Sequence, residues 1–355
     1  MTERPRHETV SALLGVWAIG ACSAEEAEAV MEHLPHCESC SAEAARLSGA
    51  ADLLGAAAPP PARLRGRVLE RARLLRPAAS PCPGYAEAYA AQVSVLDSLL
   101  RELDGPEWTV NVIYDWNVQD VVAHLAATDG LVAAQLDVPV DPPLSAGAPA
   151  NGSGTPGGGS AVPGADVAAV IEGRTAVVIG HERARPPEST RTAWRVQADA
   201  LCRGLPADSS HRLTGVPLRI ADAVVARAFE TWVHSDDIAT AVGRRLPPPL
   251  PRHLYPIAAL GVRSLPRALG RTWGERPSVA AQVVLDGPGG GQWVVGLGAR
   301  PPADSTPVVR LEMDVIEFCF LAGGRRDPAT VGAVVTGDEE LGRELLAAAP
   351  AFAGP

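Results

Sequence analysis

The stretch that decides the fold of this chain lies in its second half and carries closely spaced polar side chains: Phe229-Glu230-Thr231-Trp232-Val233-His234-Ser235-Asp236-Asp237. It belongs to residues 219–242, whose apolar residues recur at helical spacing, so the sequence predicts a helix there. Glu230 and His234 are four apart and would share one face of that helix. A carboxylate beside an imidazole can chelate a divalent metal, and one further ligand would complete a site with an open coordination position.

The further ligand that we expect is His124, which lies far upstream in an apolar segment: Trp116-Asn117-Val118-Gln119-Asp120-Val121-Val122-Ala123-His124-Leu125. Asp237 follows His234 by three residues, and we expect its carboxylate to orient that imidazole. The alternative is that His124 is a hydrogen-bonded core histidine and that Glu230 and His234 form a surface pair. The three ligand types together predict an open zinc site.

Length, charge and hydropathy limit the kinds of protein that this chain can be. A chain of 355 residues is long enough for two or three domains. The net charge of −10 argues against direct binding to nucleic acid. No run approaches the ~20 apolar residues that span a bilayer, and residues 1–8 are polar, unlike a signal peptide. We therefore expect a cytoplasmic protein that contacts no membrane.

A second and different metal pattern lies near the N-terminus: His33-Leu34-Pro35-His36-Cys37-Glu38-Ser39-Cys40. Ser23 and Glu26 form a capping-box pattern that predicts a helix up to about residue 33, and a second helix is expected over 41–54. Two thiolates and an imidazole thus fall at the junction of two helices. These soft ligands predict a closed, tetrahedral zinc site.

The set of ligands at this second site is His33, Cys37, Cys40 and a fourth residue. We favour His7 as the fourth ligand. Cys22 and His36 are the alternatives that the sequence leaves open.

Residues 1–80 resemble the zinc-binding anti-sigma domain family. The resemblance rests on His7, the pattern that ends at Cys40, and a proline-rich break followed by an arginine-rich segment, 62–76, that would form an amphipathic helix. It implies a small all-α domain that sequesters an extracytoplasmic-function-type sigma factor from RNA polymerase. A structural zinc clip with no partner, followed by a solvated linker helix, is the alternative.

The middle of the chain predicts a bundle of four amphipathic helices, which we place at 85–103, 118–136, 189–205 and 219–242. The Pro/Gly/Ser/Ala tract at 141–166 is expected to be a disordered loop within it. With the segments quoted around His124 and His234, residues 83–245 resemble the mycothiol-dependent maleylpyruvate isomerase family. That resemblance implies a DinB-type bundle whose metal ligands are His124, Glu230 and His234. It also implies a role for mycothiol, the low-molecular-weight thiol of actinobacteria.

The C-terminal part, residues 255–355, predicts an α+β domain. Strands are expected at 279–286, 292–297, 308–312 and 330–336, with helices at 314–322 and 339–348. This order resembles the sterol-carrier-like domain of the same isomerase family, which would cover one side of the metal cleft. Arg325 would then hold the thiol cofactor, or serve as a structural ion-pair partner.

Two functions follow from these patterns. The first is a cytoplasmic zinc anti-sigma factor whose isomerase-like half senses a thiol or small ligand. Oxidation of the cysteine pair, with Cys22 as a disulfide partner, could release the sigma factor. The alternative is a mycothiol-dependent isomerase or transferase with the N-terminal zinc module as a docking appendage. We favour the regulator, because an enzyme has no need for the arginine-rich segment.

Overall fold

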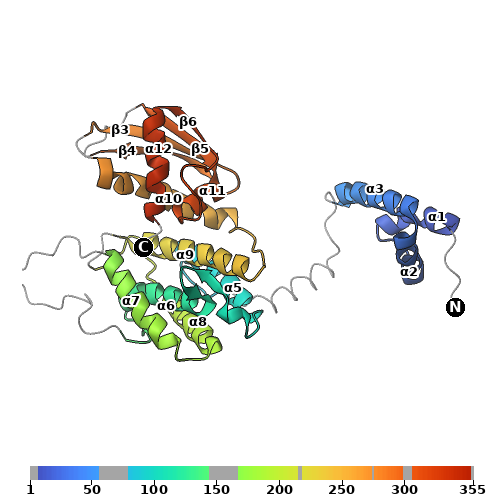
Figure 1. Cartoon of the computed structure of the whole chain (residues 1–355), viewed down its shortest axis with the longest axis horizontal. Coiled ribbons are helices and arrows are strands. Elements are labelled where there is room, and N and C mark those ends of the chain that lie inside the picture. The colour runs from blue at the N-terminus through green and yellow to red at the C-terminus, as the bar shows by residue number, and fades with distance from the viewer. Residues whose placement is uncertain are drawn as a thin grey trace, which may run out of the picture. The chain divides into compact units, whose positions relative to one another are not determined.

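The structure is a computed structural model that describes residues 7–55, 79–143, 167–214, 218–273, 276–298 and 306–352. The chain divides into two compact units, Met1–Leu74 and Leu75–Pro355 (Figure 1). The arginine-rich segment and most of the predicted disordered loop lie outside the described residues. The layout of three domains therefore stays a prediction.

The first unit consists of short helices around a small core. Its elements are α1 (His7–Ala18), α2 (Ala24–His33), the 3₁₀ turn η1 (Leu34–His36) and α3 (Glu38–Gly55). Ser23 and Glu26 form the expected reciprocal cap at the start of α2. Helix α3 starts three residues earlier than predicted, so Cys40 lies in its first turn. The core residues are Val10, Leu14, Val30, Cys40 and Ala44.

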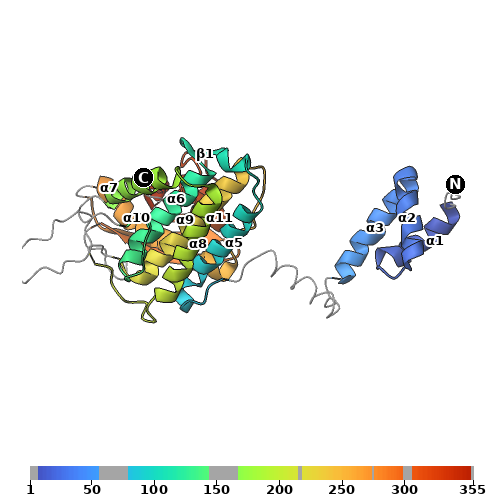
Figure 2. The ribbon, with the colours of Figure 1, turned by 90° about the horizontal axis from the view of Figure 1, so that it is seen from below.

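A helical bundle forms the first part of the second unit. Four helices lie side by side in it (Figure 2): α5 (Glu87–Arg101), α6 (Val118–Ala134), α8 (Pro187–Gly204) and α9 (Ile220–Ala241). Each of these helices begins and ends within two residues of its predicted boundaries. Asn117 and Asp120 cap the start of α6 reciprocally, which fixes the turn of helix that carries His124.

Two helices of the second unit were not expected. Helix α7 (Val167–Glu182) follows the Gly/Pro-rich tract and packs against α6. Helix α10 (Pro251–Trp273) contains Pro256 and Pro266, residues that usually interrupt helices, and it packs against α9. The bundle region therefore has a fifth helix, and α10 joins the bundle to the sheet.

A small hairpin precedes α6. Strand β1 (Asn111–Ile113) pairs with β2 (Trp116–Asn117) in antiparallel fashion, and residues 114 and 115 form the turn. Tyr114 adopts a φ of +52° in this turn. Because β2 runs directly into α6, the hairpin is held beside the helix that carries His124.

The C-terminal part is an α+β region with a mixed four-stranded sheet. The strands are β3 (Val279–Asp286), β4 (Gly291–Leu297), β5 (Val309–Asp314) and β6 (Ala333–Gly337), in the order β4-β3-β5-β6. Strand β3 pairs antiparallel with β4 and parallel with β5. Helices α11 (Val315–Ala322) and α12 (Glu339–Ala348) complete the region, close to the predicted boundaries.

One hydrophobic core runs through the bundle and the α+β region. Helices α10 and α11 lie between the sheet and α9 (Figure 1), and α10 contacts α9, α11, α12 and β4. The fully buried side chains include Leu125 and Ile238 of the bundle, Leu254 and Ile257 of α10, and Phe318 of α11. The two parts of the second unit are thus packed together. In the described residues no helix is both long and apolar enough to cross a membrane.

Candidate metal centres

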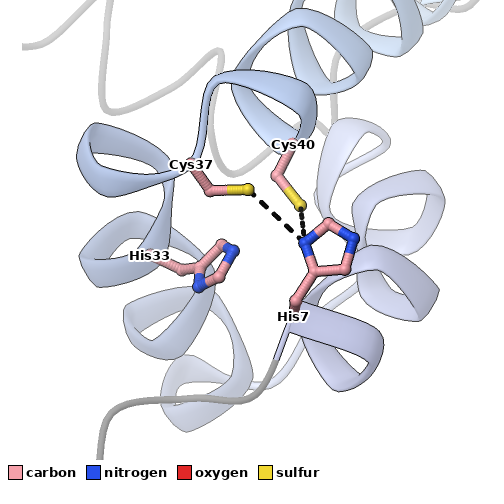
Figure 3. A group of neighbouring side chains, drawn as sticks. All are labelled: His7, His33, Cys37 and Cys40. Atoms are coloured by element: carbon pink, nitrogen blue, oxygen red, sulfur yellow. Dashed lines mark hydrogen bonds between the residues drawn. The ribbon is translucent and has the colours of Figure 1, made fainter.

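The N-terminal unit brings four metal-ligand side chains together. The ligand atoms of His7, His33, Cys37 and Cys40 all lie within 4.8 Å of one another (Figure 3). His7 Nδ1 is 3.4 Å from the sulfur of Cys37 and 3.4 Å from that of Cys40. The group contains His7, the favoured fourth ligand, while the Cys22 thiol faces the backbone oxygen of Leu13 at 4.0 Å.

The local structure explains why these residues meet. His33 ends α2, the 3₁₀ turn reverses the chain, and Cys37 and Cys40 flank the start of α3, while His7 begins α1. The positive end of the α3 dipole favours thiolates at this position. Hydrogen bonds from the Ser39 hydroxyl and the backbone of Cys40 lower the pKa of the Cys37 thiol to about 5.

His33 supplies an independent sign that this group suits a metal ion. It is 8% exposed, and both of its ring nitrogens are buried without a hydrogen-bond partner. Such orphaned polar atoms are costly in a folded protein. A metal bound to one of the two nitrogens would remove part of that cost, and two thiolates with two imidazoles are a donor set that zinc prefers.

The bundle brings the other predicted ligands near one another. His124 projects from α6 and is 6% exposed, and its Nε2 lies 3.6 Å from Glu230 Oε2 on α9. The rings of His124 and His234 have centroids 5.2 Å apart and are nearly perpendicular. Burial lowers the pKa of His124, which favours the neutral imidazole that a metal requires.

In each of these two histidines, Nδ1 already has a hydrogen-bond partner. His124 Nδ1 is 3.0 Å from the Thr175 hydroxyl of α7, and His234 Nδ1 is 3.0 Å from Asp237 Oδ2. Contacts of this kind fix the ring orientation and leave Nε2 available. The expected contact between Asp237 and His234 is therefore present, while the contribution of Thr175 was missed because α7 was not predicted.

Glu230 has a stronger partner than the sequence indicated. Arg227, one turn earlier on α9, donates to both carboxylate oxygens, with 2.7 Å from Nη1 to Oε2. Burial alone would raise the pKa of Glu230, but the charge of Arg227 outweighs it, so this pKa lies far below its ordinary value. The carboxylate is thus charged and held in place before any metal binds.

A second buried carboxylate lies close to this pair. Asp129 of α6 is fully buried and accepts hydrogen bonds from Tyr89 and Trp194 through Oδ2, while Oδ1 has no partner. Burial raises the pKa of Asp129 to about 7, although the charge of Arg227 opposes this shift. Nothing in the sequence pattern distinguished Asp129 from other carboxylates.

Arg325 links the α+β region to the bundle site. Its guanidinium donates to both oxygens of Asp237, at 3.1 Å and 2.5 Å, and one of its nitrogens lies 3.4 Å from His234 Nδ1. Arg325 is thus an ion-pair partner of the residue that orients His234. The other expected role, contact with a thiol cofactor, stays a prediction.

Several known proteins are similar to this chain. An uncharacterized protein of Mycobacterium tuberculosis, from strains CDC 1551 and H37Rv, is 29% identical over 282 residues, which is 78% of this chain and 98% of that protein. The crystal structures of the mycothiol-dependent maleylpyruvate isomerase and of a histidine-to-alanine mutant of it are 13% and 14% identical, with TM-scores of 0.42 and 0.44. Each alignment covers 71% of this chain and 91% of the solved one.

A family model matches the bundle directly. Residues 89–239 match the model described as the mycothiol maleylpyruvate isomerase N-terminal domain. The matched range includes His124, Glu230 and His234. Nothing in the comparisons supports an anti-sigma activity or a sigma-factor partner, so both stay predictions. Residues 89–239 are accordingly similar to the N-terminal domain of mycothiol maleylpyruvate isomerases.

Proposed function

We propose that the bundle holds one divalent metal ion, zinc in the first instance, between His124, Glu230 and His234, and catalyses a thiol-dependent isomerisation or transfer. The observation that carries this proposal is that Nδ1 of each histidine has a hydrogen-bond partner, Thr175 for His124 and Asp237 for His234. This arrangement leaves Nε2 of each ring for a metal, and Nε2 of His124 lies 3.6 Å from Glu230 Oε2.

Glu230 fits the role of the third ligand. Each carboxylate oxygen has two acceptor positions, so an oxygen that accepts from Arg227 retains one for a metal. Arg227 also keeps Glu230 ionised, which a metal ligand must be. The distance of 3.6 Å between Glu230 Oε2 and His124 Nε2 supports a role for both side chains as ligands of one metal ion.

A thiol is the co-reactant that this donor set favours. Zinc bound by two imidazoles and a carboxylate would leave a coordination position at which a thiol binds as its thiolate, the nucleophilic form. Mycothiol is the thiol named by the family that residues 89–239 match. This proposal thus follows the enzyme alternative of the two functions expected from the sequence.

Metal content tests the proposal most directly. The measurement needs a Cys37→Ser/Cys40→Ser background in the full chain, because the N-terminal group would bind metal as well. We expect about one zinc per chain in that background and none after His124→Ala or His234→Ala. His253→Ala, which removes another buried histidine, is the matched control and should keep the ion.

Two results would contradict this assignment. One is an unchanged zinc stoichiometry in both histidine variants. The other is a zinc-loaded protein that neither binds mycothiol in calorimetry nor converts maleylpyruvate in its presence.

The N-terminal group supports a second function. We propose that His7, His33, Cys37 and Cys40 bind zinc, because the orphaned nitrogens of His33 and the clustering of all four ligand atoms fit that ion. A sigma factor is the proposed partner of this unit. Co-purification of the intact chain with a sigma factor of its host, lost in Cys37→Ser, would support that partner, and no co-purification with the intact chain would exclude it.

A further inference from the structure

A run of aromatic rings leads from the surface to the bundle site. The exposed ring of Tyr114 stands edge-on to Trp116, with centroids 5.8 Å apart. Trp116 lies 5.1 Å from His124, and His124 lies 5.2 Å from His234. Exposure falls along this run, from 71% for Tyr114 through the half-buried Trp116 to 6% for His124. The hairpin therefore borders the solvent side of the candidate metal site.

Tyr114 is an unfavourable residue for folding at its position. Its φ of +52° lies in the left-handed region, where a two-residue hairpin turn usually has glycine or asparagine. Its exposed side chain buries little apolar surface, and the backbone conformation costs on the order of 1 kcal/mol for a residue with a bulky side chain. The Asn111 side chain bonds to the Tyr114 carbonyl at 3.2 Å and so helps to hold this turn. Neither the turn nor the core requires a tyrosine here.

From this geometry we propose that Tyr114 and Trp116 form a binding subsite for the sugar portion of the thiol co-reactant. The inference rests on the proposed function, since it assumes that the sulfur binds beside His124. The rest of a thiol anchored there would extend outward past Trp116 and reach Tyr114. The hairpin thus determines which thiols bind well.

The chemistry of the two rings matches that ligand. Aromatic side chains present rigid apolar faces with a polar tip, and the C–H groups of sugar rings pack on such faces while their hydroxyls remain solvated. Mycothiol joins an N-acetylcysteinyl group to an amino sugar and an inositol, so it carries the required sulfur at one end and sugar-like rings at the other. N-acetylcysteine carries the same sulfur without the rings.

The test compares these two thiols by isothermal titration calorimetry on the zinc-loaded full chain. Tyr114→Gly should weaken mycothiol binding about tenfold, the amount expected for loss of one aromatic contact. It should leave N-acetylcysteine binding unchanged and the thermal midpoint close to wild type, since glycine suits the turn. Tyr114→Phe keeps the ring and should keep the affinity.

The chain offers a matched control. Tyr255 is also a half-exposed tyrosine that stacks on a tryptophan, Trp293 of β4, with centroids 5.7 Å apart. Tyr255→Ala should therefore leave the binding of both thiols unchanged.

The outcomes separate this inference from the proposed function. If Tyr114→Gly leaves mycothiol binding intact, or weakens both thiols equally, the subsite is overturned while the metal site stands. If neither thiol binds the zinc-loaded wild type, the proposed function fails and the subsite fails with it. Loss of mycothiol affinity alone supports the subsite.

Discussion

Arg227 is the residue on which the charge balance of the bundle interior depends. Its side chain is 9% exposed and donates to both oxygens of Glu230, and its charge also acts on the buried Asp129. An ion pair in such a place is costly to break, because the remaining charge stays buried without compensation.

Replacing Arg227 should therefore destabilise the second unit. Arg227→Met is expected to lower the free energy of unfolding by ~3 kcal/mol, measured by urea denaturation at pH 7. Arg263→Met is the control: it breaks a pair with Asp222 in which the arginine side chain is 52% exposed, and should cost ~0.5 kcal/mol. Equal effects of the two substitutions would show that Arg227 contributes no more than an exposed arginine.

Asp129 predicts a pH dependence of stability. Its pKa in the folded protein, about 7, lies above its ordinary value of 3.8. Between these two pH values the folded chain holds a proton that the unfolded chain releases. The contribution of protonated Asp129 to the free energy of unfolding is therefore complete below about pH 4 and is lost as the pH rises toward 7. Asp129→Asn keeps the shape and cannot ionise. Its stability relative to wild type should rise by on the order of 1 kcal/mol per pH unit across this window.

Urea denaturation at pH 5, 6, 7 and 8 measures that difference. Asp222→Asn, at a partly exposed carboxylate, should instead give a curve parallel to the wild type. A parallel curve for Asp129→Asn as well would mean that Asp129 does not hold the proton.

The sequence predicts the roles of some residues in the candidate sites but not of others. The spacing of Glu230 and His234 places them on one helix face, and the Cys37–Cys40 spacing is short enough to be recognised directly. Thr175 and Arg227 could not be assigned, because their roles depend on which helices pack against α6 and on which way a long side chain turns. Asp129 differs from other carboxylates only by its burial, and burial is a property of the packed structure.

At the scale of elements, Arg325, three residues past the end of α11, forms an ion pair with Asp237 of α9. Asp237 is 12% exposed and Arg325 19% exposed, so water screens this contact only weakly. The hydrogen bonds of His234 and Arg325 keep the pKa of Asp237 low even though burial opposes them. Orientation of His234 thus depends on an arginine from another part of the fold.

Removing Arg325 should therefore weaken metal binding in the bundle without abolishing it. In the Cys37→Ser/Cys40→Ser background, Arg325→Gln is expected to lower zinc affinity roughly 10- to 100-fold, as for other residues that orient a ligand. Competition with a chromophoric chelator measures this affinity. Arg326→Gln, which removes the neighbouring arginine paired with Glu317, should have no effect. A similar loss in both variants would indicate a general effect of charge.

The elements also show where prediction from sequence is limited. Strands β3 and β4 were predicted almost to the residue, because two short apolar runs flank a glycine-rich turn, and helix α12 was predicted at its observed bounds, residues 339–348. Helix α10 was missed because its two prolines are usually incompatible with a helix interior. Helix α7 was missed because its apolar residues are spread around the helix and it follows a tract that predicts disorder.

At the scale of the whole molecule, the two units have very different cores. Among residues 7–51, the part of the first unit whose side chains the structure describes, only a few apolar side chains are buried, and a core of that size usually needs a metal or disulfides to remain folded. The second unit has a core that extends from α5 to α12. Removal of metal should therefore affect the folding of the first unit far more.

Hydrogen exchange can measure this difference in the intact chain. With a strong chelator, backbone amides of residues 7–55 should exchange at least tenfold faster, while those of α5 and α6 stay protected. Cys40→Ser should reproduce the effect without chelator. Cys22→Ser removes a cysteine outside the ligand group and should not. Unchanged protection of residues 7–55 would show that the first unit folds without a metal.

The packing of α10 between the helices and the sheet has one more consequence. Because Leu254, Ile257 and Leu265 are buried in the same apolar interior as α9 and α11, the second unit cannot open like a hinge around that joint. Heat or a protease that releases the strands should abolish the bundle's ligand geometry in the same step. A ligand of the bundle site should therefore bind and leave without separation of the helices from the sheet.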